Sequence, residues 1–244
     1  MTRALSMLGL CALLLAAMAQ AAIPSAEKIA GAIARENDQA GRAMPLFLEV
    51  ALRISGGGVS AKGEIAAHPT GLARLELRSP QGFMERHLLV GDEYSASRDG
   101  QALGSPHPFL PPLFLLQASS GAALEAALSS FGVARGEVVL GQLGDHDCYV
   151  FGGRRLPSPP ETEQLLPSLW IDMTSYEPVR IVRADGAEYR LGPIEAIDGI
   201  RLPSWIEIQS GSLRARLEIL HASRAAAPAA AFGADWLLSG SPGE

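Results

Sequence analysis

The densest group of side chains that could bind a metal or take part in catalysis is Asp145-His146-Asp147-Cys148. If this segment is a strand, His146 and Cys148 project from the same face, because side chains alternate along a strand. Two neighbouring ligands do not complete a metal site, and no second His or Cys motif with metal-ligand spacing occurs in the sequence. We therefore interpret the segment as a polar hairpin turn, and we expect neither a metal nor another cofactor.

Motifs for catalysis are missing as well. The sequence contains no G-x-S-x-G, no H-E-x-x-H and no phosphate-binding glycine loop, and the other histidines are scattered along the chain. Glu161 and Glu163 fall in a polar, proline-rich stretch, where we expect them to be solvated. We predict that the protein is not an enzyme and assign no catalytic residue. A hydrolase whose triad is assembled from distant positions remains a third alternative.

Composition limits the partners. The net charge is −6, which argues against nucleic acid, because such proteins need a basic face. It also argues against electrostatic adhesion to anionic lipid. One of the two cysteines, Cys11, lies in the apolar N-terminal stretch. Cys148 is then alone after cleavage of that stretch, so an intramolecular disulfide cannot form, and we expect a small buried residue in a strand.

The N-terminus has the three parts of a secretory signal peptide. Arg3 is followed by an uncharged run, Ala4 to Met18, and by the small-x-small site Ala19-Gln20-Ala21. The apolar run is shorter than the ~20 residues that a membrane-spanning helix needs. We expect cleavage after about Ala21 and a periplasmic location for the mature protein.

Two alternatives to this interpretation are weaker. A buried N-terminal helix would normally carry a polar stripe, and this run has none. Leu8-Gly9-Leu10-Cys11 superficially resembles a lipobox, but Leu10 stands where a small residue is expected, and Cys11 lies inside the apolar run. Acylation of Cys11 is therefore not favoured.

The rest of the chain changes from one helical pattern to strand patterns. Ser25 can cap a helix that runs to about Gln39, whose thin apolar stripe predicts a surface position. From residue 45 onward, apolar residues alternate with polar ones, as in Leu46 to Ile54 and Leu72 to Arg78. Tight turns such as Asp198-Gly199 join about ten such strands, which makes neighbours antiparallel. The predicted fold is mostly β (α+β), a curved antiparallel sheet that forms an unclosed half-barrel.

A helical insertion at about residues 106–132 interrupts the strands. Pro106 to Pro112 carries four prolines and cannot be a central strand. Pro111-Pro112 can open a short helix, and a second helix from Ala122 to about Phe131 ends before Gly132. Both helices are apolar. Ordinary packing against the sheet and a lid over a cavity are equally compatible with this pattern.

These patterns divide the chain into four parts. Residues 1–21 form the signal peptide, 22–44 the N-terminal helix, 45–224 the half-barrel with its insertion, and 225–244 a partly disordered C-terminal tail. In that tail, Phe232, Trp236 and Leu237 could dock on the body.

Two segments resemble a known family. Leu169-Trp170-Ile171-Asp172-Met173-Thr174, followed by Pro178-Val179-Arg180-Ile181, is similar to a hairpin of the LolA/LolB-like superfamily of bacterial lipoprotein-localisation factors. Asp198-Gly199-Ile200-Arg201-Leu202-Pro203, followed by Ile206-Glu207-Ile208, resembles another segment of that family. The first half agrees more loosely, at Gly63-Glu64-Ile65 and Arg74-Leu75-Glu76. The resemblance covers about residues 45–232.

This resemblance implies an unclosed half-barrel whose apolar concave side is capped by helices. It also implies an acyl chain of a lipoprotein or another lipid as the ligand, and a role in outer-membrane lipoprotein or lipid transport. The motifs include no counterpart of the family's polar clamp between barrel and lid, which makes the chain a divergent relative. The lack of a good lipobox argues against an outer-membrane-anchored acceptor of the LolB type.

The preferred hypothesis is therefore a periplasmic carrier, or chaperone, for lipid or acylated lipoprotein. The alternative is a sensor or protein-interaction module of the same fold, whose partners would be envelope membrane proteins. The sequence does not indicate an oligomeric state. The predicted residues of the cavity lining are apolar and lie on the strands: Leu48, Val50, Leu52, Leu75, Leu77, Ile171, Val179, Ile181, Ile206, Ile208 and Leu217. The predicted lid residues lie on the two inserted helices: Leu113, Phe114, Leu116, Leu124 and Leu128.

Overall fold

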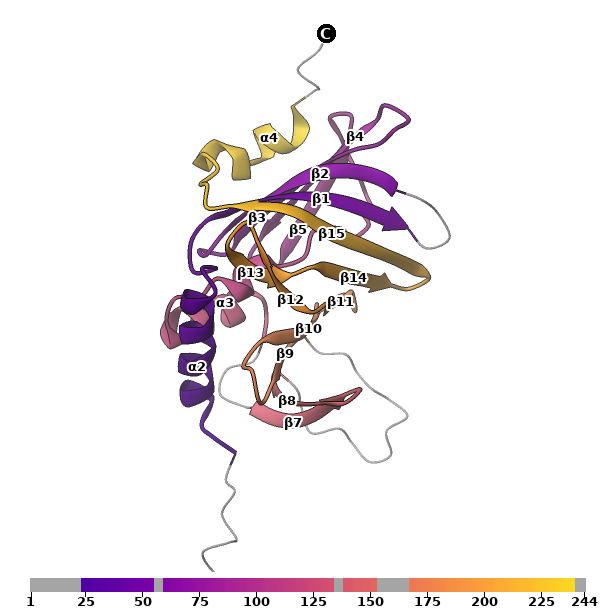
Figure 1. Cartoon of the computed structure of the whole chain (residues 1–244). Helices are drawn as coiled ribbons and strands as arrows, with labels where there is room; N and C mark the ends of the chain where they lie inside the picture. The colour runs from indigo at the N-terminus through magenta and orange to yellow at the C-terminus, as the bar shows by residue number, and fades with distance from the viewer. Residues whose placement is uncertain (1–22, 55–58, 134–137, 153–166, 240–244) are drawn as a thin grey trace, which may run out of the picture.

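The computed structural model describes residues 23–54, 59–133, 138–152 and 167–239 (Figure 1). The predicted signal peptide, the acidic residues Glu161 and Glu163, and the last residues of the tail lie outside these ranges. No helix within them is long and apolar enough to cross a membrane.

A single antiparallel sheet of thirteen strands dominates the fold, in the order β6-β5-β4-β3-β2-β1-β15-β14-β11-β10-β9-β8-β7. Its two edge strands, β6 and β7, do not pair with each other, so the sheet curves without closing. This confirms the predicted fold class, with more strands than the ten expected. A separate hairpin, β12–β13, lies beside it.

The strands are β1 Leu46–Ile54, β2 Val59–His68, β3 Leu72–Arg78, β4 Met84–Val90, β5 Glu93–Arg98, β6 Gln101–Ala102, β7 Val138–Leu143, β8 His146–Phe151, β9 Ser168–Asp172, β10 Pro178–Val182, β11 Glu188–Leu191, β12 Ile194–Ile197, β13 Ile200–Pro203, β14 Trp205–Ser210 and β15 Leu213–Ser223.

Strand register gives the sheet two different faces. An apolar row runs in register across four neighbouring strands, formed by Leu52, Leu217, Ile206 and Leu191. One residue away on each strand, a charged row runs across the same strands, formed by Arg53, Arg216, Glu207 and Arg190. Because the side-chain period of a strand is two, these rows lie on opposite faces. The apolar row faces the concave core, and the charged row faces outward.

The curvature has local causes in β1, next to the central strand β15. The register of β1 shifts between Glu49 and Val50 against β15, and between Leu52 and Arg53 against β2. Such bulges bend a strand and increase its twist. Both lie on β1, which pairs with β2 on one side and with β15 on the other.

The N-terminal helix α2 (Ala26–Gln39) begins where the sequence predicts, with Ser25 as its cap. The prediction that it lies on the surface is wrong, since Ile29 and Ile33 are buried in the main core. The reason is close packing against a second helix, α3 (Gly121–Ser130). A Cβ atom on Gly121 would lie only 3.3 Å from the backbone nitrogen of Gly31, so small residues let the helices approach and bury the narrow stripe.

The C-terminal segment docks on the convex face. It contains the short helices η2 (Ala229–Phe232) and α4 (Ala234–Leu238), which lie on the side of the sheet opposite α2 and α3 (Figure 1). Arg74 and Arg86 lie over the ring of Trp236, at 4.8 and 5.2 Å from its centroid. Arg86 also donates to the Trp236 carbonyl at 2.8 Å. The predicted docking of Trp236 is thereby confirmed, and Leu237 is buried as well.

Gly63 lies where two neighbouring strands of the sheet pack closely, which a substitution can test. Its Cβ position is only 2.0 Å from the carbonyl oxygen of Glu76 on the neighbouring strand. We expect Gly63→Ala to lower the free energy of unfolding by about 1–3 kcal/mol, because the backbone must shift. Gly104→Ala, where a Cβ meets nothing within 4 Å, is the control and should change it by less than ~0.5 kcal/mol. Urea unfolding measures both; equal effects would contradict the packing.

Candidate ligand-binding site

The cover of the concave face is a single segment that connects the two edges of the sheet. It leaves β6 at one edge, carries η1 (Leu113–Leu116) and α3, and returns to β7 at the other edge. In this path, η1 packs against β2 and β3, and α3 packs against α2. The open side of the half-barrel is therefore crossed by the segment that we predict from the sequence to be a helical insertion. We refer to residues 103–133 as the cover.

The predicted lining and lid residues meet one another. All of the lining residues except Val179 belong to one buried cluster, and all five lid residues belong to the same cluster. Leu48 and Phe114, for example, are both fully buried. The structure thus brings the two predicted sets together in a closed state, in which cover side chains occupy the concave face. Their role in ligand binding remains a prediction.

Two tyrosines fasten the start of the cover to the sheet. The hydroxyl of Tyr189 donates to the carbonyls of Pro108 and Leu110, at 3.0 and 3.2 Å. The hydroxyl of Tyr94 donates to the His107 carbonyl at 3.0 Å and accepts from the Leu110 amide at 3.1 Å. The sequence motifs did not indicate this polar clamp, because both tyrosines occupy alternating strand positions that are equally typical of core residues.

A second fastening lies farther along the cover. The Gln117 side chain is fully buried, and its Nε2 donates to the carbonyls of Met44 and Ala67, at 2.7 and 3.3 Å. Nδ2 of buried Asn37 donates to the Ala118 carbonyl at 3.1 Å. Each fastening joins a side chain to a backbone group, so the cover is held at a few defined points besides its apolar contacts.

The concave face is not entirely apolar, contrary to expectation. Glu85 and His87 of β4 lie on it, opposite Leu77 and Leu75. Nε2 of His87 lies 3.1 Å from Glu85 Oε1, and Arg98 donates to Glu85 Oε2 at 3.0 Å. Nδ1 of His87 lies 3.0 Å from the hydroxyl of Tyr94. An ionisable cluster thus adjoins the tyrosine clamp.

The environment changes the protonation of this cluster. His87 is 0% exposed, and burial lowers its pKa below the ordinary value, although Glu85 opposes the shift. Burial alone would raise the pKa of Glu85, but hydrogen bonds from His87 and Arg98 lower it. Burial also raises the pKa of Tyr94. Burial thus disfavours the charged imidazole, whereas the two hydrogen bonds favour the charged carboxylate.

An open groove of about 630 Å³ lies where β10 and β11 part. The two strands pair only from Arg180 to Val182, so Val179 and Leu191 separate beyond that point. Apolar side chains, among them Ile194 and Trp205, form much of the groove, and His146, Asp172, Glu177 and Arg201 form its polar end. Of the predicted lining residues, only Val179 contributes to it.

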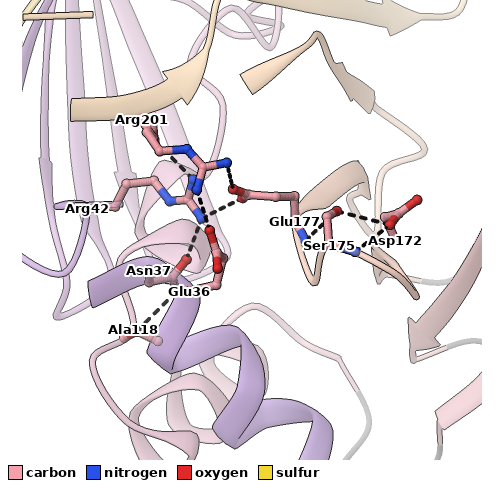
Figure 2. A network of polar contacts seen from close by, with 8 residues as sticks. All are labelled: Glu36, Asn37, Arg42, Ala118, Asp172, Ser175, Glu177 and Arg201. Atoms are coloured by element: carbon pink, nitrogen blue, oxygen red, sulfur yellow. Dashed lines mark hydrogen bonds and ion pairs between the residues drawn. The ribbon is translucent and has the colours of Figure 1, made fainter. Parts of the chain in front are cut away.

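A buried ion-pair network reaches the groove at Glu177 and Arg201 (Figure 2). Fully buried Arg42 donates to Glu177 Oε2 at 2.6 Å and to Asn37 Oδ1 at 3.0 Å. Arg201, half exposed, pairs with Glu36 at 2.7 Å and approaches Glu177 Oε1 at 3.4 Å. The network joins the end of α2, the turn after β9 and the β12–β13 hairpin. It fixes three segments that are distant in the sequence.

The segment around Cys148 has a structural role. Asp145 lies in the turn between β7 and β8, as the sequence predicts. His146 Nδ1 lies 2.8 Å from Asp172 Oδ2. Burial raises the pKa of the Cys148 thiol to about 11, so it is not an activated nucleophile. Among the described residues, no three acidic, His or Cys side chains are placed to hold a metal ion.

Comparison with known proteins gives structural likeness only. No family model matches the chain, and no curated protein matches it. The LolA superfamily protein NE2245 from Nitrosomonas europaea aligns at a TM-score of 0.49 with 12% identity, over 88% of this chain and 100% of that one. A putative outer membrane lipoprotein-sorting protein domain from Vibrio parahaemolyticus aligns at 0.49 with 10% identity and the same coverage.

We expect replacement of the two arginines of the buried network to lower the free energy of unfolding by different amounts. Arg42→Met should lower the free energy of unfolding by about 3–5 kcal/mol, because it leaves the Glu177 carboxylate buried without its closest partner. Arg201→Met should lower the free energy of unfolding by at most about 1 kcal/mol, because the Arg201 side chain is 49% exposed. Adding Glu177→Gln to Arg42→Met should recover part of the loss. Chemical denaturation measures all three; equal costs would show that Arg42 is not the central group.

His87 predicts a pH dependence of stability. Because burial lowers its folded-state pKa, the unfolded chain takes up a proton first, and the free energy of unfolding falls as the pH decreases below about 6.5. Glu85 adds a loss in the same direction at lower pH, since its folded-state pKa is also depressed. His87→Gln should flatten the dependence just below about pH 6.5. Exposed His221→Gln is the control, and an identical slope in both variants would refute the assignment.

Proposed function

We propose that this protein is a periplasmic carrier that binds an acyl chain of a lipid or lipoprotein on the concave face of its sheet, beneath the cover. The observation that carries the proposal is the unclosed sheet, whose apolar concave face is covered by one segment linking its two free edges. In the described structure the cover is closed on this face. In it, Leu113, Phe114 and Leu116 occupy the face on which the chain would lie.

The energetics allow exchange between the cover and a ligand. Each side-chain hydrogen bond that fastens the cover contributes only about 1 kcal/mol net. Burial of acyl CH₂ groups contributes ~0.8 kcal/mol each, or roughly 10 kcal/mol for a chain of a dozen. An acyl chain that takes the place of Leu113, Phe114 and Leu116 exposes these side chains, at a loss of about 1.5–3 kcal/mol each. The gain from the acyl chain and the loss of the cover contacts are therefore similar in size, so the two can exchange. Closing of the cover releases the acyl chain again.

The ionisable cluster suggests an orientation for the ligand. Glu85, His87 and Arg98 lie on β4 and β5, toward the β6 edge of the sheet. The uninterrupted apolar row that includes Leu52 and Leu217 lies at the centre. The polar head of the ligand would thus lie near the tyrosine clamp, with its chain along the centre of the sheet.

A second candidate is a protein-interaction module of the same fold. The observation in its favour is that the concave face is filled by the protein's own side chains. Edge strand β7 carries Leu140, which is 54% exposed, and it offers a free strand edge within the described residues. In that case no lipid would be bound.

Native mass spectrometry of the mature protein, purified from a bacterial periplasm and then incubated with lipid, tests the carrier. We expect acylated species to bind, and the double variant Tyr94→Phe/Tyr189→Phe to bind them faster, because both hydroxyl fastenings of the cover are lost. Tyr149→Phe is the matched control, since Tyr149 packs on Tyr176 and not on the cover backbone. If neither the wild type nor the double variant binds lipid, the carrier is rejected and the interaction module is favoured.

A further inference from the structure

The groove between β10 and β11 differs from the concave face in its accessibility. It is open in the closed form of the protein, so a ligand can reach it without moving the cover. Its apolar part combines Pro178 and Val179 on one side with Leu191 and Ile194 on the other. A preformed apolar groove of this kind is typical of a small-molecule site.

Trp205 gives the groove a rigid wall. A Cβ atom on Gly192 would lie 2.4 Å from the ring of Trp205, so only glycine allows the ring to rest against this backbone. The guanidinium of Arg216 lies over the same ring, 4.3 Å from its centroid. The indole is therefore held in place by β15 and by the chain after β11, and it contributes to the groove.

The polar end of the groove carries a net negative charge. Of the charged side chains that line the groove, Asp172 and Glu177 are carboxylates and Arg201 is a guanidinium. Behind them, Arg42 pairs with Glu177, and Glu36 pairs with Arg201. Hydrogen bonds from Ser175, Thr174 and His146 outweigh the effect of burial and lower the pKa of Asp172 to about 2, so its charge persists. Such an end favours a cationic group over an anionic one.

We infer that this groove is a second binding site, for a single-chain amphiphile whose alkyl chain lies against Val179, Leu191 and Trp205 and whose ammonium head lies at Asp172. The site goes beyond the proposed acyl carrier and does not depend on it, because the cover stays closed. Occupation of the groove brings an alkyl chain to the point where the sheet parts. Leu191 belongs both to this groove and to the concave core.

Tryptophan fluorescence of the mature protein tests the site. Dodecylammonium, titrated at pH 8 below its micelle concentration, should change the emission in a saturable way, and dodecanoate of the same chain length should bind several-fold more weakly. Trp205→Phe should remove the change, although Trp170 and Trp236 remain. A change that persists in Trp205→Phe overturns the site.

Matched variants separate the groove from the concave face. Val179→Gln should weaken dodecylammonium binding about tenfold, and Val90→Gln, which alters an exposed valine on β4, should not. Asp172→Asn should remove the preference for dodecylammonium over dodecanoate. The Tyr94→Phe/Tyr189→Phe variant should bind the probe as the wild type does. Unchanged binding by Val179→Gln, with tighter binding by the tyrosine variant, would place the probe under the cover and reject the groove.

Failure of this inference is distinguishable from failure of the proposed function. If dodecylammonium gives no saturable change while native mass spectrometry still shows bound acylated species, the groove is rejected and the carrier stands. If the fluorescence results are as expected while no acylated species binds, the groove stands and the carrier is rejected.

Discussion

The structure depends on one constraint, which is that the two edges of the sheet do not meet. A closed barrel would satisfy its edge strands and fill its interior from its own strands. Here β6 and β7 remain apart, and the concave apolar face needs another partner. The cover supplies it, and the cover is also the connection between those same two edges. Both η1 and α3 therefore lie on the segment that spans the open side.

The cover is held to the sheet by contacts of two kinds, apolar and polar. Apolar contacts between cover and sheet are non-directional, and a ligand of similar chemistry can replace them. The contacts made by Tyr189 and Gln117 are directional and fix where the cover closes. By contrast, the buried ion pair between Arg42 and Glu177 does not include a residue of the cover. It holds the end of α2 to the turn that follows β9. The contacts that fix where the cover closes and the ion pair at the end of α2 are therefore made by different residues.

The sequence predicted the parts of this fold that depend on local periodicity. The alternation in Leu46 to Ile54, the cap at Ser25 and the turn at Asp198-Gly199 each depend on nearby residues, and each was found as expected. The apolar set that meets the cover also followed from alternation. The tyrosine clamp, the Glu85–His87 pair and the Arg42 network could not be predicted, because each joins residues through register or packing between distant segments. The buried position of α2 was missed for the same reason, since it depends on Gly31 meeting Gly121.

The groove at β10 and β11 shows how a local irregularity creates a site that periodicity hides. The alternating pattern makes Val179 a lining residue of the concave face, as it would be if the two strands paired along their whole length. The register shift after Pro178 and the short pairing with β11 instead leave Val179 at an opening in the sheet. The adjacent Gly192 and Trp205 then form a wall that neither residue type alone would indicate. An unclosed sheet can therefore offer two kinds of apolar surface, one that is exposed only when its cover moves and one that is open while the cover is closed.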